Sequence, residues 1–391
     1  MSTNAPQPNP GNVFPSIDIL RGFAAVSVLV YHVIEHFGWK TFPTAGPLLW
    51  FRIGWMGVDL FFVISGFVIG ISAFRGYQSN GPAFKRAFAI NRLARIVPLY
   101  ALTCVVYLFF ISPQLFYSDF LGNGLSHALF IHNLFPAYHG SLNGVNWLLG
   151  VEMQFYVCVM LVTPLFVGLK WQVWFPCLIL ISWAWRLGVT FIVPPGAEHT
   201  FLRFFGTTQL PGALDHFATG MLLARLAMDE NGGKVFALAR RYPAIPLAIA
   251  SLTGYAALHV FWRNSNYWDN SYMVIGFRTL LSIPICFCIL SACSLNGPTW
   301  LRVTRPLQYI GTISYGIYLW HLPLIESFKR LTWLEPQQAL QAVMLGTLVL
   351  SILSWHFFEK PMMSKLRAVR TPGEPAIPGV QTNRSQITTL S

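Results

Sequence analysis

The first long apolar segment of the chain, residues 17–37, contains an arginine and a histidine, Arg21 and His32. An ionisable side chain inside a bilayer costs a few kcal/mol, so one that is retained usually faces the protein interior or water and has a function. On a helix the eleven-residue step from Arg21 to His32 spans about 16 Å. We therefore expect a fixed cation near one face of a membrane and a titratable base well towards the other.

The composition as a whole is typical of a membrane protein. Of the 391 residues 54% are hydrophobic and only 10% are charged, and the mean hydropathy is +0.52, whereas soluble domains have about 25% charged residues. The net charge of +12 does not indicate nucleic-acid binding, because the basic residues gather in short loops between apolar segments. The six cysteines lie in or beside those segments without CxxC spacing, so we expect neither disulfides nor a metal site.

Ten apolar segments have the length of a membrane span. They lie at about 17–37, 55–73, 96–111, 147–169, 171–193, 211–227, 243–261, 273–293, 309–328 and 340–358. The second and sixth loops between them are rich in Lys and Arg, which by the positive-inside rule places both termini in the cytoplasm. We expect an all-α, polytopic integral membrane protein with about ten transmembrane helices.

The same pattern divides the chain into three parts. Residues 1–16 are expected to form a short cytoplasmic segment without a cleavable signal peptide, because they contain no Lys or Arg. Residues 17–362 form the membrane domain. Residues 363–391 are expected to be a disordered cytoplasmic tail, since most of this stretch is polar, contains Pro and Gly and has no hydrophobic period.

With this topology, position in the sequence becomes depth in the membrane. Most of the ionisable residues within the spans are expected in the outer half of the domain; they are His32, Asp59, Glu152, Arg186, Asp215, His216, Arg278 and His321. The inner face instead carries Arg21, Arg92 and Arg95 and few carboxylates. A base with carboxylates on one side and an anion site on the other favour a reaction that draws one reactant from each side.

Each of these residues also has a purely structural interpretation. A single polar side chain can join two helices by a hydrogen bond, and for Arg186, Asp215 and His216 this is at least as good as a functional role. Arg92 and Arg95 can be ordinary positive-inside charge. His321 stands before Pro323, which can mark a kink.

Six motifs, taken in order, resemble those of the acyltransferase 3 family, the bacterial membrane-bound O-acyltransferases that act on cell-surface sugars. They are Ile17-Asp18-Ile19-Leu20-Arg21-Gly22 with Tyr31-His32, Gly57-Val58-Asp59 with Ser65-Gly66-Phe67, Arg92-Leu93-Ala94-Arg95 with Pro98 and Tyr100, Trp147-Leu148 with Glu152 and Tyr156, Ser314-Tyr315 with Tyr318 and His321-Leu322-Pro323, and Phe358-Glu359-Lys360-Pro361. The resemblance covers residues 14–362. Leu148 departs from it, because the family usually has Ser or Thr after the Trp. We also expect the chain to work without the esterase-like domain that is fused to some members.

The resemblance implies a multi-pass protein of the bacterial inner membrane that moves an acyl group, commonly acetyl, from cytoplasmic acyl-CoA to a sugar hydroxyl outside. Arg21, Arg92 and Arg95 are the candidates for binding acyl-CoA, since arginine binds phosphate by directed, charge-assisted hydrogen bonds. Acyl-CoA is then a co-substrate, and we expect no permanently bound cofactor and no metal.

For the chemistry we expect His32 to be the general base that deprotonates the acceptor hydroxyl. Asp59 or Glu152 would orient the imidazole and stabilise its charged form, with His32 and Asp59 facing each other on consecutive spans. Asp59 should therefore matter more than Asp215. A covalent acyl-histidine remains an alternative route. The candidates for acceptor binding are then Trp147, Tyr156, Asp215 and His321.

Two other classes of protein are compatible with intramembrane charges. A transporter or flippase of a sugar-linked lipid or an anion also uses them, but the chain has no inverted repeat and no paired broken spans. A structural or sensory protein does not need so many ionisable groups at one depth. The acceptor stays open between O-antigen, exopolysaccharide, peptidoglycan, a nodulation-type oligosaccharide and a glycoside. The kind of acyl group and the oligomeric state are likewise open.

Overall fold

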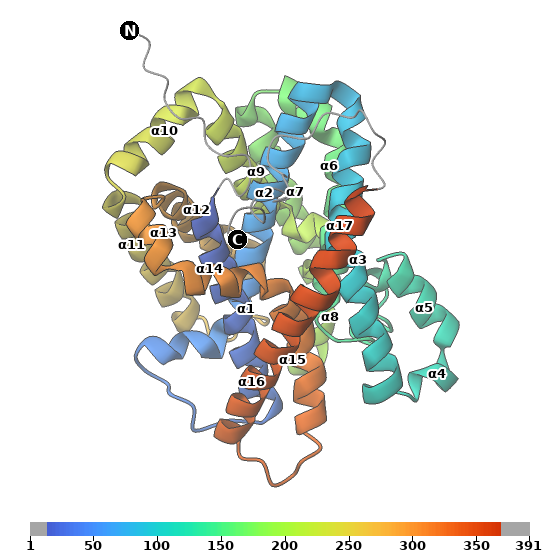
Figure 1. Cartoon of the computed structure of the whole chain (residues 1–391). Coiled ribbons are helices and arrows are strands. Elements are labelled where there is room, and N and C mark those ends of the chain that lie inside the picture. The colour runs from blue at the N-terminus through green and yellow to red at the C-terminus, as the bar shows by residue number, and fades with distance from the viewer. Residues whose placement is uncertain (1–13, 369–391) are drawn as a thin grey trace.

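The computed structural model describes residues 14–368, and this part of the chain consists of helices and the loops between them (Figure 1). The α-helices are α1 Pro15–His36, α2 Gly57–Asn80, α3 Phe84–Val106, α4 Leu115–Ser118, α5 Phe120–Ala128, α6 Trp147–Gly168, α7 Trp171–Ile192, α8 Thr200–Thr207, α9 Leu210–Met228, α10 Glu230–Arg241, α11 Ala244–Arg263, α12 Arg278–Ser294, α13 Pro298–Val303, α14 Arg305–Thr312, α15 Ser314–Phe328, α16 Pro336–Ser354 and α17 Lys360–Ala368. The predicted all-α class is confirmed.

Each of the ten predicted spans overlaps at least one of these helices. By length and composition, seven helical segments of the described residues qualify as membrane spans, and one of them, Pro47–Ile111, runs through both α2 and α3. The chain is therefore a multi-pass membrane protein. The count of ten spans stays a prediction, because α15 has only 15 residues and a span needs about 20. The orientation of the chain in the membrane also stays a prediction.

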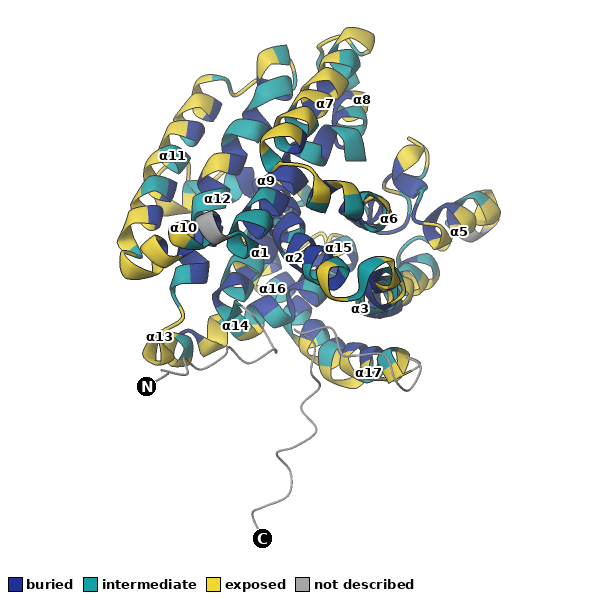
Figure 2. Ribbon diagram, turned by 90° about the horizontal axis from the view of Figure 1, so that it is seen from above, coloured by how far each residue is buried: buried dark blue, intermediate teal, exposed yellow. Residues whose placement is uncertain are grey.

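The centre of the bundle is formed by α1, α2, α9 and α15 (Figure 2). In the most apolar 18-residue stretch of α1, 56% of the residues are buried. In the corresponding stretch of α7, only 11% are buried. The outward face of α7 nevertheless consists of large apolar side chains such as Leu180, Phe191 and Ile192, all exposed. An apolar face without protein cover is expected where a helix meets lipid.

Two glycines bring α2 and α9 into direct backbone contact. A Cβ at Gly66 would collide with the carbonyl oxygen of Phe217, and one at Gly220 would collide with that of Val63. Small residues allow helix backbones to approach this closely. The contact fixes the register in which Asp59 on α2 meets His216 on α9.

The ends of the membrane domain differ from the expectation in one respect. The predicted tail 363–391 is helical as far as Ala368, because α17 continues the line of α16 beyond a short π-helical segment, Trp355–Glu359. Residues 369–391 lie outside the described residues, as do residues 1–13 of the predicted cytoplasmic segment 1–16.

Candidate active site

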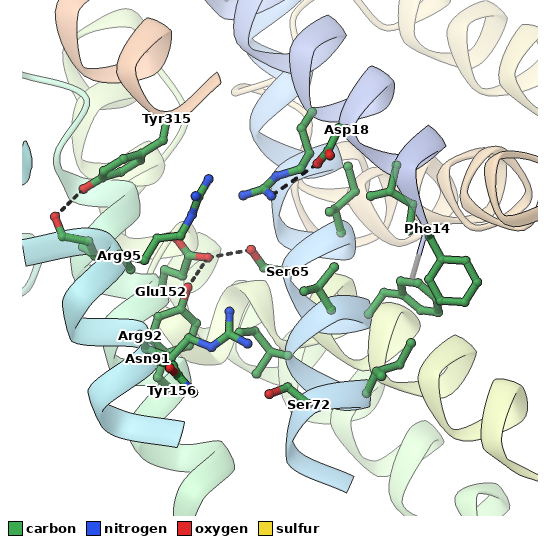
Figure 3. Close-up of a pocket in the computed structure, with 18 of the residues that line it drawn as sticks. Phe14, Asp18, Ser65, Ser72, Asn91, Arg92, Arg95, Glu152, Tyr156 and Tyr315 are labelled. Carbon is green, nitrogen blue, oxygen red and sulfur yellow. Dashed lines mark hydrogen bonds and ion pairs between the residues drawn. The ribbon is translucent and has the colours of Figure 1, made fainter. Parts of the chain in front are cut away.

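A cavity with a volume of about 330 Å³ opens beside the first turns of α1. Its wall comes from α1, α2, α3, α6, α15 and α17 (Figure 3). The polar lining consists of Asp18, Arg21, Ser65, Ser72, Arg75, Asn91, Arg92, Arg95, Glu152, Tyr156, Tyr315 and Arg367. Five arginines face two carboxylates, so the cavity carries a net positive charge and suits a ligand with several negative charges.

The two arginines of the α3 motif lie on its wall, and among the described residues neither forms an ion pair with a carboxylate. Arg92 lies over the ring of Tyr156 at 5.9 Å, and Arg95 lies over the ring of Trp355 at 5.7 Å. These ring contacts hold the guanidinium groups in place and leave hydrogen-bond donors for a ligand. The sequence prediction that Arg21, Arg92 and Arg95 belong to one anion site therefore has matching geometry. Arg21 also lies 3.8 Å from Asp18.

Glu152 lies in this same cavity and not beside His32, where its position in the span had placed it. The hydroxyls of Ser65 and Tyr156 donate to its Oε1 at 2.6 and 2.7 Å (Figure 3). The reason is that α6 begins inside the protein, since the residues before it, including Asn143 and Asn146, are buried. Glu152, five residues after the start of α6, therefore lies in the middle of the bundle.

A second, smaller cavity of about 50 Å³ continues from the first. The two share Arg21, Ser65 and Glu152, and the smaller one extends to Phe61 and Tyr318. The ring of Tyr318 lies 5.9 Å from that of His321. This smaller cavity forms a narrow passage that leads from the anion site towards His321, and neither His32 nor His321 is among the residues that line it.

His32 pairs with His321 beyond the smaller cavity. The distance from His32 Nδ1 to His321 Nε2 is 3.0 Å, and His321 Nδ1 lies 3.1 Å from the carbonyl oxygen of Ile317. A carbonyl can only accept, so in a neutral ring His321 Nδ1 carries the proton and its Nε2 accepts. His32 then donates from Nδ1, and its Nε2 keeps a free lone pair.

The expected pairing of His32 with Asp59 is wrong in geometry. Asp59 is fully buried, 3.2 Å from His216 and 3.3 Å from Arg278. The close α2–α9 contact turns it towards α9 and α12, away from α1. The sequence could not show which way α2 is rotated about its axis, because both faces of this helix are apolar.

Asp59 belongs to a buried charge cluster that also contains Asp215. Asp215 accepts from Arg186 and pairs with the ring of His216 at 2.6 and 2.8 Å, and the hydroxyl of Thr279 donates to its other oxygen. The cluster joins α2, α7, α9 and α12, and its side chains are 3% exposed or less. This supports the helix-bridging interpretation of Arg186, Asp215 and His216.

The sequence profile of the acyltransferase 3 family, described as an acyltransferase domain, matches residues 14–356. The chain belongs to the acyltransferase 3 family. Membership of this family favours an acyltransferase over the transporter and the sensory protein. No solved structure matches it.

Several curated relatives from other bacteria resemble the chain at low identity. The peptidoglycan O-acetyltransferase OatA of Listeria monocytogenes is 26% identical over 89% of the chain and 55% of its own length. The putative peptidoglycan O-acetyltransferase YrhL of Bacillus subtilis is 25% identical over 90% of the chain and 55% of its own length. The putative membrane-bound transacylase BcsY of Komagataeibacter xylinus is 27% identical over 90% and 83%. The chain thus spans about half the length of the first two.

The family motifs differ in where they lie. Arg21, the arginine pair of α3 and Glu152 line the cavity. Trp147, from the same motif as Glu152, instead stacks on His139 with ring centroids 5.8 Å apart. Burial lowers the pKa of His139, in the loop before α6, to about 4, so the ring on Trp147 is neutral. Tyr156, expected to bind the acceptor, instead lines the cavity and donates to Glu152.

Sequence reasoning missed part of the acyltransferase cavity. Arg75 and Arg367 line it, although one had been assigned to loop charge and the other to the tail. Ser65 and Tyr315 stood in the motifs without a role. Tyr315 donates to the carbonyl oxygen of Ile96 at 2.8 Å and so fixes α15 beside the arginine helix α3. Arginines that recur near the same end of several helices were the signal available in the sequence.

Proposed function

We propose that the protein is a membrane O-acetyltransferase of the bacterial inner membrane that transfers acetyl from cytoplasmic acetyl-CoA to a hydroxyl of an extracytoplasmic glycan. The observation that carries the proposal is the order of sites along α1. The arginine cavity lies at Arg21, the narrow passage follows, and the His32–His321 pair stands about three turns further on. The peptidoglycan O-acetyltransferases among its relatives support the same class of acceptor.

The donor's phosphates fit the arginine cavity. Guanidinium groups bind phosphate oxygens through paired N–H donors, and Arg92 and Arg95 have no competing carboxylate partner among the described residues. The pantetheine arm would lie in the narrow passage past Ser65 and Tyr318, which carries the thioester towards His32. Glu152 holds the hydroxyls of Ser65 and Tyr156 and so shapes the junction of the two cavities.

The acceptor hydroxyl then gives its proton to His32 Nε2 as its oxygen attacks the thioester carbonyl. The new C–O bond forms, the C–S bond breaks, and the proton on His32 passes to the departing thiolate of CoA. His321 accepts the N–H from His32 Nδ1 throughout and so keeps the free lone pair on Nε2. His321 therefore orients the imidazole of His32, which is the role first expected for Asp59. In this proposal His321 positions the base and does not bind the acceptor, as was first expected.

A transfer assay tests the proposal. Purified protein in detergent receives radiolabelled acetyl-CoA and surface glycan that has been stripped of its esters by mild base. Wild type should place base-labile label on the glycan and release one CoA for each acetyl group. His32→Ala should lower this rate by about 10²–10⁴-fold, as loss of a general base does. A wild-type protein that consumes no acetyl-CoA with any glycan would refute the proposed function.

A further inference from the structure

A second imidazole lies one helical turn beyond His32. His36 is the last residue of α1, and its ring lies 5.9 Å from that of His32, centroid to centroid. Its Nδ1 stands 3.0 Å from Oε1 of Glu326 near the end of α15. The side chains of His36 and Glu326 are 27% and 29% exposed, so a ligand can reach both.

The pair stands on the opposite side of His32 from the arginine cavity. Along α1 the order is Arg21, His32, His36, and the large cavity surrounds only the Arg21 end. A donor that enters from the arginines reaches His32 through the narrow passage. The acceptor must then come from the other side, where the His36–Glu326 pair lies and the ring of His36 is 5.9 Å from that of His32.

The chemistry of the pair fits a polyhydroxylated ligand. An ionised carboxylate offers only acceptors on its two oxygens, and an imidazole adds a ring N–H donor or a ring nitrogen acceptor. Neighbouring hydroxyls of a sugar match such a set, and hydrogen bonds to a charged group are stronger than those between neutral groups. A lipid tail would gain nothing from this pair.

We propose that His36 and Glu326 form the acceptor subsite, holding the sugar hydroxyls next to the one that reacts at His32. This proposal rests on the proposed function, since it places the acceptor of that reaction. Both residues position the substrate and take no part in the bond changes. Their loss should therefore act on the apparent KM for the glycan and leave that for acetyl-CoA unchanged.

The test is a two-substrate kinetic analysis of Glu326→Gln and His36→Ala. The probe is de-esterified surface glycan from a source strain that lacks the gene, varied at saturating acetyl-CoA, and then acetyl-CoA varied at the highest glycan concentration. Each variant should raise the apparent KM for glycan about 10- to 100-fold, the effect of losing a hydrogen bond that involves a charged group. Glu335→Gln is the matched control, because Glu335 is an exposed carboxylate in the loop after α15 that caps α16.

The outcomes separate this subsite from the proposed function. An unchanged glycan KM in both variants, with wild type active, overturns the subsite alone. A parallel loss of kcat and of acetyl-CoA affinity also overturns it, because that pattern marks a structural contact between α1 and α15; His36→Gln then shows whether shape alone restores activity. Absence of transfer in wild type would instead overturn the proposed function.

Discussion

At His32 the chemistry depends on which ring nitrogen carries the proton. The carbonyl oxygen of Ile317 fixes the proton on His321 Nδ1, and His321 in turn fixes the proton on His32 Nδ1. In the proposed mechanism a histidine thus does what a carboxylate does in the better-known triads. Because the partner is neutral, it orients the ring without supplying a full counter-charge to the imidazolium.

The first prediction concerns this partner. His321→Ala should lower kcat for acetyl transfer by about 10²–10⁴-fold, since a general base in the wrong tautomer loses most of its effect. The apparent KM for acetyl-CoA should not change. His321→Gln should keep more activity than His321→Ala, because its side-chain carbonyl can accept the same N–H. Equal rates in His321→Ala and wild type would remove His321 from the mechanism.

At this scale the sequence was a good guide to residue identity and a poor one to pairing. Arg21, Arg92 and Arg95 could be grouped because fixed cations near one membrane face follow from the topology. The partner of His32 could not, because contact depends on how each helix is rotated about its axis. Asp59 and Glu152 lie at depths compatible with His32 by counting, yet the rotation of α2 and the buried start of α6 take them elsewhere.

Among the helices, α3 carries Arg92 and Arg95, which in the proposed function bind the phosphates of acetyl-CoA. We expect Arg92→Ala and Arg95→Ala to raise the apparent KM for acetyl-CoA about 10- to 100-fold with a smaller effect on kcat, because phosphate contacts persist from ground state to transition state. Arg86→Ala is the control, since Arg86 is exposed on the same helix and does not line the cavity. Wild-type donor KM in both variants would show that the pair is only topological charge.

The buried cluster around Asp59 and Asp215 joins four helices, and its loss should affect stability before chemistry. Asp215→Asn leaves Arg186 without its counter-charge, and removing one partner of a buried pair costs about 3–5 kcal/mol. Asp59→Asn should destabilise similarly, because it faces Arg278 and His216. Thermal unfolding in detergent would show both midpoints lowered, while Glu198→Gln at the exposed surface should not shift. This replaces the expectation that Asp59 supports His32 directly.

If instead Asp59→Asn unfolds at the wild-type temperature but has lost transfer, the cluster has a catalytic role after all.

The positions of the helices could be predicted from the sequence, since every predicted span overlaps at least one helix. Their lengths could not, because α15 is shorter than a span and α16 is followed by a π-helical segment and α17, which changes which residues reach each face.

In the proposed mechanism for the whole molecule, donor and acceptor reach His32 from opposite ends of α1. The composition and loop charges predicted a membrane protein, and the depths of the ionisable residues favoured one reactant on each side, which stays a prediction. In the structure the arginine cavity and the His32–His321 pair lie at different positions along α1. The sequence did not show the two cavities, because the larger one is made by side chains from six helices that meet only in the folded bundle.

Transfer across a sealed membrane tests this claim most directly. Inverted inner-membrane vesicles expose the cytoplasmic face and right-side-out spheroplasts expose the other, and each is given radiolabelled acetyl-CoA and de-esterified glycan in the medium. Labelled acetyl-CoA added outside should be consumed only by inverted vesicles that also hold glycan in their lumen. Added glycan should gain acetyl esters only with spheroplasts, and these esters should be unlabelled because they come from internal acetyl-CoA. His32→Ala should abolish both reactions. Acetylation of added glycan by external acetyl-CoA in one sealed preparation, with both substrates on the same face, would contradict the account.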